Sequence, residues 1–122
     1  CLGAIYMAGL RHIHYAFPDA YAGSTNLLGK TPYLAYKPVK TYPPQPGPLY
    51  EIVAAMQIEF NLRRGGRFLD VQQAMCKSAG AGVALSEQLF AGQTLQKYAD
   101  QNLSAGEVFE RLAQQVAALE AA

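Results

Sequence analysis

The sequence predicts a mainly α-helical fold, in which a small domain of three to five short helices follows an extended arm rich in tyrosine and proline. Two observations support this division. All seven prolines and seven of the eight tyrosines fall within the first 50 residues. After Pro48, apolar residues recur at helical spacing and no proline interrupts them. We therefore assign residues 1–48 to an irregular arm and residues 49–122 to a helical domain.

The beginning of the arm, residues 2–16, has the apolar spacing of a short helix, although the same pattern allows a strand from Ile13 to Phe17. The composition of residues 18–32 is that of a loop, because Asp, Gly, Ser, Thr and Asn dominate it. Little regular structure is therefore expected in this stretch.

The end of the arm is expected to be extended. Residues 33–42 are rich in β-formers, but Pro38 lacks a backbone donor, so the sequence allows one strand there only at a sheet edge. Four of residues 43–48 are proline, which fixes φ and favours a polyproline or turn conformation.

Helices are predicted after the arm. Pro48 suits the first position of a helix, where its missing N–H has no intrahelical partner, and Gly65 and Gly66 end that helix. Further helices are predicted from Arg67 to the small-residue stretch 79–82, from 83 to 91, and as a short turn near residues 95–99. The apolar face predicted for the first helix consists of Leu49, Ile52, Val53, Met56 and Phe60.

The last helix is the most clearly specified element. Ser104 and Glu107 have the spacing of a capping box, in which each side chain bonds the backbone N–H of the other residue. A single apolar stripe then continues for about four turns, formed by Val108, Leu112, Val116 and Leu119. This stripe must pack against another helix, either the one that begins at Pro48 or a partner's, and it is too short to favour a free-standing coiled coil.

The charge distribution limits the classes of partner. A net charge of +1 gives no electrostatic support for binding nucleic acid or a membrane surface. Residues 1–67 carry seven Lys/Arg against three acids, whereas residues 68–122 carry three against six, so the two parts are expected to attract each other or to face different partners. No apolar run has the roughly 20 residues that span a bilayer. A membrane would be reached only through a lipid anchor.

Cys1 has three interpretations. A bacterial lipoprotein begins at an acylated cysteine after its signal peptide is removed, which would place the protein at the bacterial envelope. A hydrolase with an N-terminal nucleophile would use the Cys1 thiolate, with His12 or His14 as the acid/base. The third interpretation is an arbitrary boundary within a longer chain. Apart from the first of these, the sequence leaves localisation unknown.

His12 and His14 would lie on one face of a strand and could approach a metal ion together. Zinc sites normally need at least three protein ligands, and Asp19 is the only nearby carboxylate. We therefore predict no metal site, and the sequence has no motif for a cofactor.

An anion site is one interpretation of Arg63, Arg64 and Arg67, which surround two glycines before a helix N-terminus. The alternative is structural: the arginines stabilise the C-terminal end of one helix, and the glycines supply its cap.

A partner-binding surface is predicted where tyrosines and lysines alternate, at Tyr33, Tyr36, Lys37, Lys40 and Tyr42. The same tyrosines could instead form a local core. The sequence thus favours a non-enzymatic interaction or assembly subunit of a larger complex, with a protein partner or a second copy of the chain. The alternative is a small hydrolase that uses Cys1.

Overall fold

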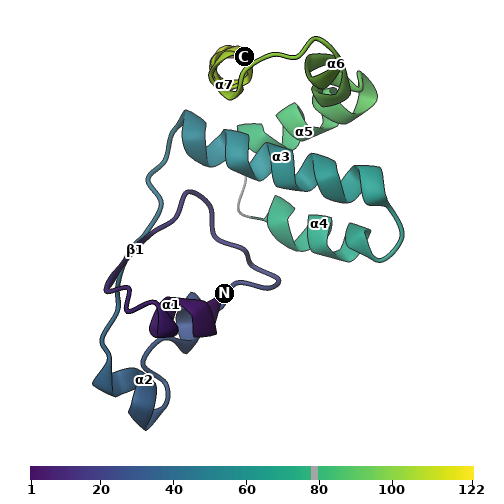
Figure 1. Cartoon of the computed structure of the whole chain (residues 1–122). Coiled ribbons are helices and arrows are strands. Elements are labelled where there is room, and N and C mark those ends of the chain that lie inside the picture. The colour runs from purple at the N-terminus through teal and green to yellow at the C-terminus, as the bar shows by residue number, and fades with distance from the viewer. Residues whose placement is uncertain (78–79) are drawn as a thin grey trace. The chain divides into compact units, whose positions relative to one another are not determined.

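A computed structural model describes residues 1–77 and 80–122 of the chain (Figure 1). Within these residues the chain is mainly helical, which confirms the predicted fold class. The chain forms two compact units, Cys1–Pro44 and Gln45–Ala122.

The N-terminal unit, Cys1–Pro44, contains more regular structure than the sequence suggests. Its helices are short, and its two strands form a parallel sheet in which His12 pairs with Lys40, and His14 with Tyr42. In chain order the elements are α1 (Leu2–Met7), β1 (His12–His14), the 3-10 helix η1 (Thr25–Leu27), α2 (Pro32–Tyr36) and β2 (Lys40–Tyr42).

Two local predictions for this unit were correct only in part. The short helix expected within residues 2–16 is present but ends at Met7, and Gly9 then adopts a positive φ of 73°, which the helix could not continue through. The alternative strand from Ile13 to Phe17 corresponds in part to β1, which covers His12–His14.

The strand that the sequence allowed within residues 33–42 is present as β2, but it covers only Lys40–Tyr42. Residues 32–36 form a helix instead, because the hydroxyl of Thr31 accepts a hydrogen bond from the Leu34 N–H at 3.2 Å, with Pro32 in the first turn.

Tyr6 provides the buried anchor of the N-terminal unit. It is 3% exposed, and its hydroxyl accepts a hydrogen bond from the Gly29 N–H at 3.3 Å. Asp19 holds a turn, since its Oδ1 accepts the N–H groups of Tyr21 and Ala22 at 2.9 and 2.8 Å.

The C-terminal unit, Gln45–Ala122, is a set of helices. As predicted, its first helix begins at Pro48 and ends at Arg64, directly before Gly65 and Gly66. These two glycines have φ of 64° and 57°. The expected end of the second helix near residue 79 lies outside the described residues. The helices are α3 (Pro48–Arg64), α4 (Phe68–Cys76), α5 (Ala81–Ala91), α6 (Thr94–Asp100) and α7 (Ala105–Ala121).

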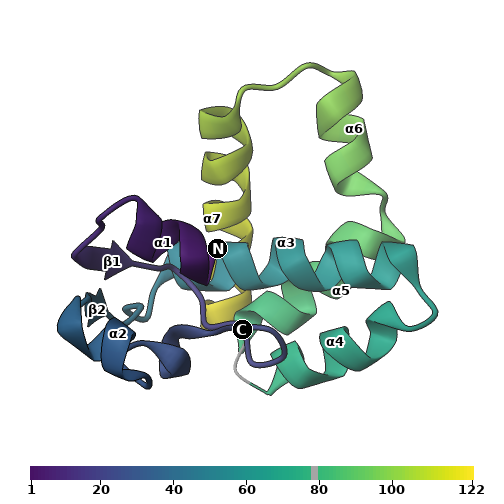
Figure 2. The same ribbon diagram turned by 60° about the horizontal axis from the view of Figure 1, so that its bottom comes forward.

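The core of this unit lies between α3, α5 and α7, and Figure 2 shows α7 crossing α3 steeply near the beginning of α3. The predicted capping box is present: Ser104 Oγ accepts the Glu107 N–H, and Glu107 Oε2 accepts the Ser104 N–H. The predicted stripe of α7 is also confirmed, because Leu112 and Val116 are fully buried and packed against α3 and α5. The buried cluster consists of Ile52, Ala55, Leu85, Leu89, Leu112 and Val116.

The predicted apolar face of α3 was wrong in part. Leu49, Met56 and Phe60 are 53%, 43% and 39% exposed, whereas Ala54 and Ala55 are fully buried. Gly82 of α5 lies so close to α3 that a Cβ there would be 3.2 Å from the Ala54 Cβ. Small residues therefore select the contact face, because they let the two helices approach closely.

The Glu51 carboxylate of α3 caps the N-terminal end of α5. Its Oε2 accepts the Gly82 N–H at 2.7 Å. The N-cap residue of α5 is Gly80, which has no side chain that could accept this hydrogen bond. A carboxylate at this end also interacts favourably with the helix dipole.

We expect Glu51→Ala to lower the free energy of unfolding by about 1–3 kcal/mol, because it removes a hydrogen bond to a charged group. Urea denaturation followed by circular dichroism would measure the loss. Glu87→Ala removes an exposed charge from α5 and should change stability by less than about 0.5 kcal/mol. Equal effects of the two substitutions would contradict the capping role of Glu51.

Candidate functional site

Two histidines, a lysine and a tyrosine lie on one face of the small sheet in the N-terminal unit. The parallel register places His12 beside Lys40 and His14 beside Tyr42. Because side chains alternate along a strand, these four project on one side of the sheet, and the half-buried Ile13 and Thr41 project on the other. We call His12, His14, Lys40 and Tyr42 the His/Tyr/Lys face.

Tyr42 is the centre of this face. The His14 ring stacks on it, with the ring centroids 4.2 Å apart and the planes 3° from parallel. His12 Nδ1 shares a hydrogen bond with the Tyr42 hydroxyl at 2.9 Å, and the His12 tautomer decides which atom donates. The Lys40 ammonium lies 5.1 Å from the Tyr42 ring centroid, within the range of a cation–π contact.

The residues predicted to bind a partner fall into two groups of contacts. Lys40 and Tyr42 belong to the His/Tyr/Lys face. Tyr33 and Lys37 form a second group, with the Lys37 Nζ 5.0 Å from the Tyr33 ring centroid. Tyr36, the last residue of α2, is 83% exposed.

The histidines share one side of β1, but their surroundings differ from those of a metal site. Both contact Tyr42, and within residues 1–77 and 80–122 no group of three or more His, Cys, Asp or Glu residues is placed to hold an ion.

Cys1 is exposed and lies at a small cavity of about 80 Å³. Ile13 lines the same cavity and projects from the opposite side of β1 to His12 and His14. The arrangement thus gives no support to a hydrolase in which either imidazole activates the Cys1 thiol. The other residues that line the cavity are Leu2, Ile5, Ser24, Thr25 and Leu28.

The three arginines predicted as an anion site have different surroundings. The Arg63 Nε and Nη2 each donate to one oxygen of Glu59 at 3.1 Å, which forms a bidentate ion pair along α3. The guanidinium carbons of Arg63 and Arg64 lie 5.7 and 5.8 Å from the Phe60 ring centroid. Arg67 follows Gly66 as an exposed residue.

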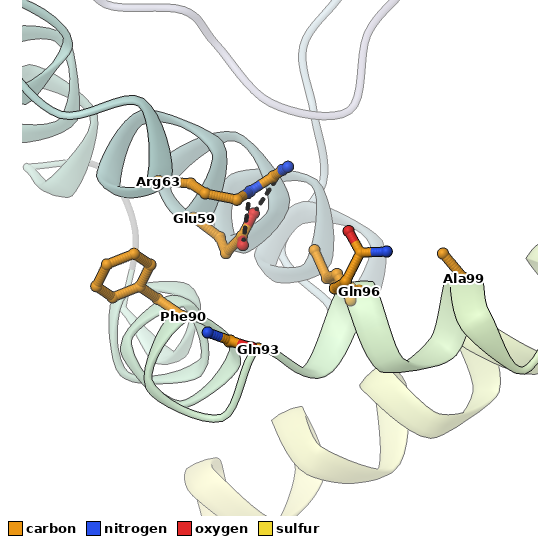
Figure 3. Close-up of a pocket in the computed structure, with 7 residues that line it drawn as sticks. Glu59, Arg63, Phe90, Gln93, Gln96 and Ala99 are labelled. Carbon is orange, nitrogen blue, oxygen red and sulfur yellow. Dashed lines mark hydrogen bonds and ion pairs between the residues drawn. The ribbon is translucent and has the colours of Figure 1, made fainter.

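Glu59 also lines a pocket of about 540 Å³ in the C-terminal unit, shown in Figure 3. This volume lies within the range of small-molecule sites. Among the predicted site residues only Arg63 belongs to it. The spacing of Glu59 four residues before Arg63 is the one sequence feature that could have indicated the site. The lining residues are Glu59, Arg63, Phe90, Gln93, Leu95, Gln96 and Ala99.

Among the described helices, none combines the length and apolar character needed to cross a membrane. No protein-family model matches this chain, and comparison with curated proteins and with solved structures gave no match.

Proposed function

We propose that this chain is a non-enzymatic interaction or assembly subunit, and that its N-terminal unit binds an acidic segment of a protein partner. The observation that carries the proposal is the His/Tyr/Lys face, in which a stacked aromatic pair is combined with an adjacent lysine. A cation beside a large, ordered aromatic surface suits a protein interface.

The charge of the N-terminal unit supports an acidic partner. Residues 1–44 contain four Lys/Arg and a single acid, Asp19. Asp19 Oδ1 already accepts two backbone N–H groups, whereas Lys30, Lys40 and Arg11 are exposed. An acidic peptide would meet little repulsion here, and its carboxylates would be attracted at longer range.

The aromatic groups supply contact area at a low cost in conformational entropy. Stacking on His14 and the bond to His12 hold the Tyr42 ring in one position, so little freedom remains to be lost when a partner binds. Tyr33 and Tyr36 are exposed on α2 and add further tyrosine surface to the same unit.

We expect Tyr42→Ala to weaken binding of a fluorescein-labelled Glu/Gly peptide about tenfold or more, because it removes the ordered aromatic centre of the face. Lys40→Gln should weaken binding about threefold, and this effect should fade at high salt, because an exposed charge is screened. Fluorescence anisotropy would measure both affinities, with a Gln/Gly peptide as the uncharged reference.

Lys30→Gln is the matched control, because it removes an exposed charge from the same unit outside the His/Tyr/Lys face. An equal loss for Lys30→Gln and Lys40→Gln, or no preference for the acidic peptide, would contradict the proposal. Sedimentation velocity tests whether the partner is instead a second copy of the chain. A dimer that dissociates in the Tyr42→Ala variant would identify the second copy as the partner.

A further inference from the structure

We infer that the pocket between α3, α5 and α6 binds an uncharged small molecule in which an amide group is attached to an aromatic ring. This site belongs to the C-terminal unit and is independent of the function proposed for the N-terminal unit. Its walls come from three elements. Glu59 and Arg63 lie on α3, Phe90 lies near the end of α5, and Gln96 and Ala99 lie on α6 (Figure 3).

The Glu59–Arg63 pair makes the polar side of the pocket electrically neutral. The Glu59 side chain is 5% exposed, and the Arg63 side chain is 57% exposed. Each Glu59 oxygen accepts one N–H from Arg63. A carboxylate has about four acceptor positions and a guanidinium has five N–H donors, so the pair retains both acceptors and donors.

Two glutamines add amide groups to the same cavity. Gln96 Nε2 donates one hydrogen bond to Asp100 Oδ1 at 3.0 Å, and the amide retains its carbonyl oxygen and a second N–H. Gln93 lies between α5 and α6 with φ of 49° and ψ of 38°, a left-handed conformation that costs a residue with a Cβ about 1 kcal/mol or more. Such strained residues are concentrated at ligand sites.

The polar groups select the charge of the ligand. An anion that approached Arg63 would meet the Glu59 carboxylate beside it, and a cation that approached Glu59 would meet the Arg63 guanidinium, because these two charges are already paired with each other. An uncharged amide offers one acceptor and two donors at neighbouring atoms. It therefore matches the Glu59–Arg63 pair and the glutamine amides without an unpaired charge.

The apolar lining selects the rest of the ligand. Phe90 is 43% exposed although it lines the pocket, and Leu95 and Ala99 continue the apolar wall. Exposed aromatic surface in a concave site favours an aromatic ring, which can stack on Phe90 or meet it edge to face. An aromatic carboxamide thus satisfies the polar and the apolar walls together.

Nicotinamide is the probe, and nicotinate, which replaces its amide with a carboxylate on the same ring, is the matched control compound. We expect nicotinamide to give saturable shifts of the backbone amide signals of residues 90–99 in the isotope-labelled full chain. An affinity of about millimolar is appropriate for so small a ligand. Nicotinate should bind at least about tenfold more weakly, because its carboxylate would lie beside that of Glu59 and the Arg63 guanidinium is already paired with Glu59.

Gln93→Gly is the most informative variant. Glycine adopts the left-handed conformation without strain, so the chain should be as stable as before or more stable, while the affinity for nicotinamide falls about fivefold or more. Phe90→Ala should lower the affinity for nicotinamide by about tenfold. Gln88→Ala, an exposed change on α5 outside the pocket, should leave the affinity unchanged.

The inference is overturned if nicotinamide gives no saturable shifts, if nicotinate binds equally well, or if Gln93→Gly leaves the affinity unchanged. Loss of binding in Gln93→Gly and Phe90→Ala, with Gln88→Ala unaffected, would establish the pocket as the site.

Discussion

Replacing Leu112 with alanine should lower the free energy of unfolding of the helical unit by about 2–5 kcal/mol. Leu112 is fully buried on α7 and belongs to the cluster that includes Ile52, Leu85 and Leu89. The substitution removes apolar contacts and leaves a cavity between three helices, which relax only partly around it. Domains of this size are stable by about 5–15 kcal/mol, so the loss is a large part of the total.

Urea denaturation followed by circular dichroism would give the midpoint and slope for Leu112→Ala. The control is Gln114→Ala, an exposed change on the same helix, which should alter stability by less than about 0.5 kcal/mol. A similar small effect for both variants would show that α7 is not packed on α3 and α5 in solution.

Removal of residues 1–44 should abolish binding of the acidic peptide and leave the helical unit folded. The buried cluster of α3, α5 and α7 comes entirely from residues 45–122. The cut also retains Gly47, whose carbonyl accepts the Glu51 N–H at 3.2 Å, and Pro48 as the first residue of α3. The N-terminal unit, by contrast, contributes all of the His/Tyr/Lys face.

The truncated chain should show a helical circular dichroism spectrum, a cooperative unfolding transition and no change in anisotropy of the labelled peptide. Peptide binding by the folded fragment would place the binding surface outside residues 1–44 and contradict the proposed function. A fragment without cooperative unfolding would show instead that the helical unit depends on the N-terminal residues.

The helices that could be predicted from the sequence are those with local start and stop residues. The capping box of Ser104 and Glu107 involves residues three apart, and its prediction was confirmed. Pro48 and the glycines at 65 and 66 similarly fix the ends of α3 through their own backbone preferences. No tertiary contact is needed to recognise these features.

The face of α3 could not be predicted because it is selected by a partner helix. Large apolar residues suggested a face with Leu49, Met56 and Phe60, but close approach to Gly82 favours the side that carries Ala54. A periodicity that counts only large side chains gives little weight to alanine and glycine. The position of Gly82 against α3 becomes visible only when both helices are in place.

The candidate sites were predictable to different degrees. Lys40 and Tyr42 were identified from their types and spacing, but their contact with His12 and His14 depends on the pairing of two strands distant in sequence. In the pocket, Gln93 and Gln96 are uncharged and belong to no motif, so the sequence gives no reason to select them.

The starts of α5 and α7 differ in where along the chain they are encoded. Residues 104–107 contain everything that caps α7. The N-terminal end of α5 instead receives its carboxylate from Glu51, 31 positions earlier. A peptide beginning at residue 80 would therefore contain the whole of α5 without the group that caps it, whereas a peptide beginning at residue 104 would contain α7 together with its cap.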